Sequence, residues 1–72
     1  MKLDPQKFTI KINEAIGRGA TMGQIMDAAG YSSERRIKQL MKGDDTNINP
    51  RIGEALAKFL KCKTRDISKE AA

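Results

Sequence analysis

The sequence predicts an all-α fold, a small bundle of four to five helices in one domain. Three observations predict it: apolar residues recur at helical spacing, capping residues precede these segments, and glycines follow them. A chain of 72 residues can bury only one small core. We expect a single domain over residues 1–72, with its core at 8–67, a frayed tail at 68–72, helices at roughly 5–17, 22–29, 34–42 and 50–62, and an optional short turn at 65–68.

Asp4 and Pro5 indicate where the first helix begins, because an aspartate accepts hydrogen bonds from free backbone N–H groups and proline fits the first helical position. The apolar stripe of this helix is Phe8, Ile12, Ala15 and Ile16. Residues 8–12 also alternate as a short strand would, through Ile10, so helix and strand are both open here. In a helix Ile10 lies off the stripe, either half covered by the domain's own tail or in a contact between subunits.

A short second helix lies between two glycine signals. The glycines in residues 17–19 favour a turn, and Thr21 with Gln24 three residues later forms a possible capping box. Gly30 supplies the positive φ that ends a helix sharply. The inward face is Ile25, Ala28 and Ala29. Gly23, inside this helix, costs about 1 kcal/mol relative to alanine; a packing constraint or the close approach of a phosphate would account for it.

The third helix carries the densest charge in the chain. Ser32 or Ser33 can cap it, and Ser33 is favoured because Glu34 then takes the first helical position, where a negative charge suits the helix dipole. Residues 33–43 hold four cations against one glutamate, a net +3 of the chain's +5. At about 100° per residue, the inward face is Ile37, Leu40 and Met41, and the outward face is Arg35, Lys38, Gln39 and Lys42, with Arg36 on the flank.

The fourth helix follows Gly43 and a polar loop at 44–48. Asn49 and Pro50 indicate where it begins, as a capping residue followed by proline at the first helical position. Its apolar stripe is Ile52, Ala55, Leu56, Phe59 and Leu60. Thr64 is a candidate cap for a final turn that carries Ile67.

Several function classes are disfavoured by residue content. Without histidine and with one cysteine, Cys62, the chain cannot form a Cys/His zinc site or an internal disulfide, and we expect no metal and no other cofactor. No serine or cysteine has a plausible base beside it, so an enzyme is not expected, and Asp44 and Asp45 indicate a turn. No apolar run approaches the roughly 20 residues of a membrane span, and the first residues lack a signal-peptide core, so we expect a cytoplasmic protein.

A set of residues spread over 8–67 matches a known pattern. The set is Thr21 opening the short helix, Ile25 buried within it, Gly30 at the turn, Ile37 and Leu40 as inward residues, Gly43, and the run I-x-x-A-L-x-x-F-L at 52–60. In these features the chain resembles the Cro and phage-repressor (lambda-repressor-like) family of helix-turn-helix proteins. It differs from that family at Met22 and Met26, where glutamine and alanine are usual, and in a turn one residue longer between Gly30 and Ile37.

The resemblance implies a sequence-specific regulator of transcription that binds double-stranded DNA. It would be a repressor of Cro type from a phage, prophage or plasmid, in the cytoplasm of a bacterial or phage-infected cell. It implies that the recognition helix, residues 33–42, enters the major groove. The expected base-reading residues are Arg35, Lys38 and Gln39, and the expected phosphate-binding residues are Thr21, Met22, Ser33, Arg36 and Lys42. A homodimer is expected on a two-fold operator, with its interface either at Phe59 and Lys63 or around Ile10.

Other functions use the same residues. A basic helix face is often merely solvated, and a small helical interaction module, an inhibitor or adaptor, would use this face on an acidic protein partner. Nonspecific coating of the nucleoid is a third alternative. Salt dependence and sequence preference distinguish these functions. No membrane and no small-molecule substrate is expected as a partner.

Overall fold

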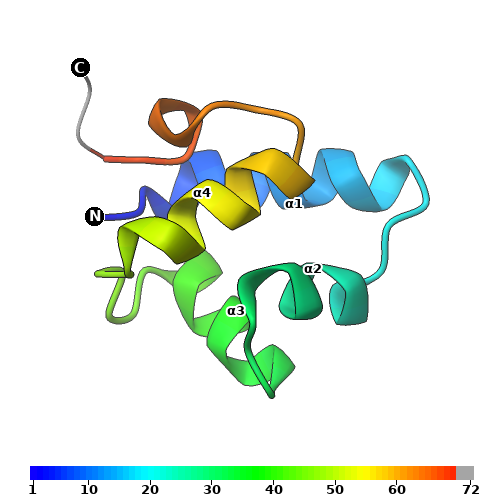
Figure 1. Ribbon diagram of the computed structural model, residues 1–72, viewed down its shortest axis with the longest axis horizontal. Helices are drawn as coiled ribbons and strands as arrows, with labels where there is room; N and C mark the ends of the chain where they lie inside the picture. Colours follow the sequence, from blue (N-terminus) through cyan, green and yellow to red (C-terminus); the bar gives the residue numbers. More distant parts are fainter. Residues whose placement is uncertain (70–72) are drawn as a thin grey trace.

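The fold is all-α, as predicted, over residues 1–69, the part of the chain that this computed structural model describes (Figure 1). The elements are α1 (Pro5–Gly17), α2 (Met22–Ala29), α3 (Glu34–Lys42), α4 (Pro50–Phe59) and the 3-10 helix η1 (Thr64–Asp66). The main helix contacts join α1 to α3 and α2 to α4, around one core. The described residues also form two isolated β-bridges, Lys2 with Asn47 and Leu3 with Ser68, but no strand.

Residues 8–12 are helical, which resolves the choice between helix and strand. The Asp4 carboxylate caps α1 by accepting from the N–H groups of Gln6 at 2.9 Å and Lys7 at 3.1 Å. Phe8, Ile12 and Ala15 are buried as expected. Ile16 is 44% exposed, so its place in the predicted stripe is wrong. The reason is that α3 meets the first half of α1, where Thr9 Oγ1 donates to the Met41 carbonyl, and leaves the last turn less covered.

The second and third helices begin as predicted. Thr21 and Gln24 form the capping box of α2, with Thr21 Oγ1 accepting from the Gln24 N–H at 3.2 Å and Gln24 Oε1 accepting from the Thr21 N–H at 3.1 Å. Ser33, rather than Ser32, caps α3 by accepting from the Arg35 N–H at 3.1 Å. A side chain at Gly23 would contact nothing nearer than Thr21 Oγ1 at 3.8 Å, so a packing constraint does not explain that glycine.

All four helices end in the same hydrogen-bonded motif, in which a residue with positive φ follows the last turn. That residue is Gly19 after α1, Gly30 after α2, Gly43 after α3 and Lys61 after α4, with φ of 100°, 77°, 92° and 58°. The next N–H then donates to a carbonyl five residues back, from Ala20 to Ala15, Tyr31 to Met26, Asp44 to Gln39 and Cys62 to Ala57. After α4, Lys61 takes the position that glycine holds after the other three helices, so α4 ends at Phe59. The predicted end of this helix at residue 62 is wrong. The final turn lies at Thr64–Asp66 instead of 65–68.

The first and last described residues pack against each other. The Leu3 N–H donates to the Thr46 carbonyl at 2.9 Å, and the Lys69 N–H donates to the Lys2 carbonyl at 2.9 Å. Leu3 is completely buried and Ser68 is 6% exposed. The core therefore begins at Leu3 instead of residue 8, and fraying at 68–69 is a wrong prediction; residues 70–72, the rest of the predicted frayed tail, lie outside the described residues.

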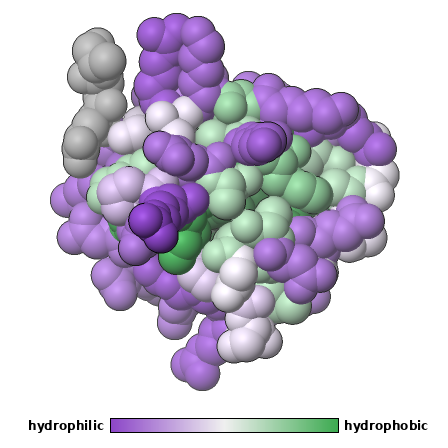
Figure 2. All heavy atoms as spheres, viewed as in Figure 1, coloured by the Kyte–Doolittle hydropathy of each residue, from purple (hydrophilic) through white to green (hydrophobic). Residues whose placement is uncertain are grey.

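The core is a single cluster to which every helix contributes. Its largest fully buried side chains are Leu3, Phe8, Ile12, Ile25, Ile37, Leu40, Leu56 and Ile67. Met22, Met26 and Met41 are half-buried against this cluster, the gap-filling use of methionine. On one face of the molecule, apolar side chains lie across the middle and hydrophilic side chains surround them (Figure 2).

Candidate nucleic-acid interface

The outward side of α3 is a cationic surface. Arg35, Lys38 and Lys42 are exposed there, and Gln39 is half-buried beside them. Ile37 and Leu40, completely buried, fix the opposite side of the helix against the core. We call Arg35, Lys38, Gln39 and Lys42 the α3 outer face. It brings together the three residues expected to read bases and one of those expected to bind phosphate.

The cations of the α3 outer face have no internal partner. Within residues 1–69 the ion pair present is Lys11 with Glu14, at 3.4 Å on α1, and the side chains of Arg35, Lys38 and Lys42 make no hydrogen bond. Exposed cations without a neighbouring carboxylate retain their attraction for an external anion. Glu34 lies at the start of the same helix, where its charge suits the helix dipole.

Arg36 does not belong to this face. Its Nη2 donates to the Asp45 carbonyl at 2.8 Å and to the Asn47 carbonyl at 3.5 Å, so the guanidinium holds the loop between α3 and α4. It also bonds to the Tyr31 hydroxyl; burial raises the pKa of Tyr31, and the Arg36 charge offsets part of that rise. Arg36, expected to bind phosphate, is therefore engaged within the protein and positions the loop.

The start of α2 is a second group of donors. The N–H groups of Met22 and Gly23 have no acceptor among the described residues, because the Thr21 side chain satisfies only Gln24. Such free N–H groups carry the partial positive charge of a helix start. The start of α2 is separated from the turn at Gly30 by the length of the helix, about 12 Å. Thr21 and Met22 therefore lie at the far end of α2 from that turn, whereas Ser33 lies directly before the α3 outer face.

Neither a metal site nor a membrane span is found in the described part of the chain. No three His, Cys, Asp or Glu side chains in residues 1–69 lie together as metal ligands would. Asp45 has a φ of 49°, the left-handed backbone of a turn. No helix over the same residues is both long and apolar enough to cross a bilayer. Cys62 is half-buried, and burial, followed by the charge of Asp66, raises the pKa of its thiol.

Searches of protein-family models, curated proteins and solved structures found no match for this chain. What it does must therefore be inferred from its own residues.

Proposed function

We propose that this protein is a sequence-specific regulator that binds double-stranded DNA by placing α3 in the major groove. The observation that carries this proposal is the α3 outer face, with three exposed cations that have no ion-pair partner within residues 1–69. An α-helix with its side chains is about 10–12 Å across, a size that the major groove, about 12 Å wide, accommodates.

Arg35, Lys38 and Gln39 are the proposed base-reading residues. Arg35 and Lys38 stand in the first half of α3, the half that lies nearest the base edges when a recognition helix enters the groove, and Gln39 follows just past its middle. A guanidinium pairs well with guanine and an amide with adenine, and a good bidentate pair contributes about 1–3 kcal/mol of discrimination.

Phosphate contacts are proposed for Lys42, the Ser33 hydroxyl, and the N–H groups at the start of α2 with Thr21 and Met22. Gly23 supports the last of these, because its missing side chain leaves the helix start open and no packing need accounts for it. Arg36 is not included, since its Nη2 donates to the carbonyls of Asp45 and Asn47 and the side chain is directed to that loop.

We propose further that the protein acts as a homodimer on half-sites about one helical turn apart, as a repressor of Cro type. Between the two candidate interfaces, exposure favours the segment around Ile10, which is 57% exposed, over Phe59, which is half-buried. A sedimentation measurement tests this: an Ile10→Glu variant remains monomeric at concentrations where the parent protein dimerises. Equal dimerisation of both would exclude this interface.

The DNA proposal is tested by selecting bound sequences from a random duplex pool and then titrating the selected site at several salt concentrations. We expect one enriched motif and an affinity that falls steeply with salt. Arg35→Ala changes the base preference at one position, whereas Lys42→Ala weakens binding to all sequences and lowers the salt slope by about 1. Lys58→Ala removes an exposed cation from α4 and is the matched control, with both properties unchanged.

Two results would contradict the proposal. Feeble binding at low salt, with no motif, favours the alternative in which the same face binds an acidic protein. Tight, salt-sensitive binding without a motif favours nonspecific coating of DNA.

A further inference from the structure

An open cleft lies where the end of α1, the start of α2 and the end of α4 meet. Its volume is about 410 Å³, within the size range of small-molecule sites. Apolar side chains form part of its lining: Ala15 is buried, and Ala20 and Phe59 are half-buried. An aromatic ring beside two alanines offers a flat apolar surface.

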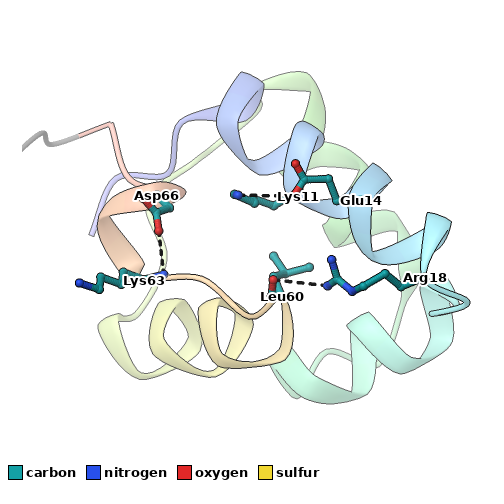
Figure 3. A network of polar contacts seen from close by, with 6 residues as sticks. All are labelled: Lys11, Glu14, Arg18, Leu60, Lys63 and Asp66. Carbon is teal, nitrogen blue, oxygen red and sulfur yellow. Dashed lines mark hydrogen bonds and ion pairs between the residues drawn. The ribbon is translucent and has the colours of Figure 1, made fainter.

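The polar groups that line the cleft are donors. Arg18, Gln24 and Lys61 contribute to it, and no carboxylate does. The Arg18 side chain extends from α1 to the Leu60 carbonyl, to which its Nη2 donates at 3.5 Å (Figure 3). This single bond fixes the guanidinium at the cleft and leaves its other N–H groups available. Gln24 Oε1 already accepts from the Thr21 N–H, so its amide NH₂ is the end left for a ligand.

Nearby carboxylates do not neutralise these cations. Glu14 pairs with Lys11 at 3.4 Å, and Asp66 accepts from the Lys63 N–H at 2.9 Å (Figure 3). Neither acid lines the cleft. Two cationic side chains, an amide donor and an apolar surface therefore converge from three helices without an internal anion.

We propose that this cleft binds a small organic carboxylate, with its anionic group between Arg18 and Lys61 and its apolar body on Phe59. Carboxylate is the matching charge for a guanidinium, which holds it with two parallel hydrogen bonds. This site does not include the α3 outer face, so the inference does not depend on DNA binding.

The test is an NMR titration of the ¹⁵N-labelled protein with benzoate and with N-acetyl-leucine at constant ionic strength. We expect saturable shifts in the millimolar range at residues 18–20, 24 and 59–61. Benzamide and N-acetyl-leucinamide, which have the same apolar bodies without charge, bind at least about tenfold more weakly. Tighter binding of benzoate indicates a free aromatic acid, and tighter binding of N-acetyl-leucine indicates the carboxyl end of a peptide; both support the site.

Two variants show whether the assigned cations hold the anion. Arg18→Gln and Lys61→Asn each weaken benzoate binding at least about fivefold. Asparagine is chosen at 61 because it tolerates the positive φ there. Lys63→Gln removes an exposed cation that does not line the cleft and leaves binding unchanged. Shifts confined to α3, equal binding of acid and amide, or unchanged binding by both variants would overturn the proposal.

Discussion

Replacing Lys61 with glycine should stabilise the protein. Lys61 is the one residue of the four helix ends that holds the left-handed conformation with a side chain, at a φ of 58°. A residue with a side chain pays about 1–2 kcal/mol to adopt this conformation, and glycine does not. Glycine also gives the unfolded chain more conformational freedom, which lowers the free energy of unfolding by about 0.5–1 kcal/mol. No hydrogen bond or ion pair of the Lys61 side chain is found in residues 1–69, so the substitution removes no such contact. The expected net gain is about 0.5–1 kcal/mol.

The opposite substitution provides the matched comparison. Gly43→Ala places a side chain at a φ of 92°, with its Cβ 3.4 Å from the Pro5 ring. It should lower the free energy of unfolding by about 1–2 kcal/mol. Gly17→Ala is the same chemical change at a position without positive φ, where the new Cβ contacts nothing within 4 Å. It should raise stability by up to about 1 kcal/mol.

Thermal unfolding followed by far-UV circular dichroism measures all three variants. A change of 1 kcal/mol corresponds to a shift in melting temperature of roughly 4–8 °C for a domain of this size, so each effect is measurable. The reasoning would be refuted if Lys61→Gly were destabilising, or if Gly43→Ala and Gly17→Ala changed stability in the same direction.

Three further predictions concern the first helix and the single thiol. Leu3→Ala removes completely buried methyl and methylene groups and should cost about 2–5 kcal/mol in urea unfolding, whereas Ile16→Ala, at a side chain 44% exposed, should change stability by less than about 0.5 kcal/mol; equal effects would show that Leu3 is not in the core. Asp4→Ala should lower the free energy of unfolding by about 1 kcal/mol because the cap of α1 is lost. Asp4→Asn should retain most of that stability, because asparagine also caps helices. Equal losses in thermal melts would exclude the capping role. Because burial raises the pKa of the Cys62 thiol, the folded state holds that proton more tightly, and the free energy of unfolding should fall as pH rises above about 8.5. Cys62→Ala should reduce this fall between pH 7.5 and 9.5, and an unchanged pH dependence would contradict it.

Local signals in the sequence predicted the first three helices to the residue. Each of these helices begins at a capping residue, namely Asp4, Thr21 or Ser33, and is followed by a glycine. Both signals lie within a few residues of the helix end that they determine, so the spacing along the sequence is enough to predict that end. The same spacing placed Ile37 and Leu40 inward and the α3 outer face outward.

The missed features depend on contacts that spacing does not record. The end of α4 could not be predicted because a lysine in the sequence does not indicate a left-handed backbone. The burial of Leu3 could not be predicted because its hydrogen-bond partner, Thr46, lies far along the chain. Arg36 was assigned to phosphate because a helical projection shows direction but not the loop carbonyls that it reaches. The cleft at Arg18 and Lys61 was not predicted, since three separate helices form it.

The pairing of residues 2–3 with residues 68–69 has a consequence for the order of folding. Ser68 Oγ donates to the Lys2 carbonyl across 66 residues, among the longest separations that the fold closes. Closing a loop of that length costs more chain entropy than forming the short-range helix contacts, and few interactions compensate it until both ends have a surface to dock on. We therefore expect the helices to assemble first and these two segments to join afterwards. Removing the Ser68 hydroxyl should then accelerate unfolding while leaving the refolding rate nearly unchanged.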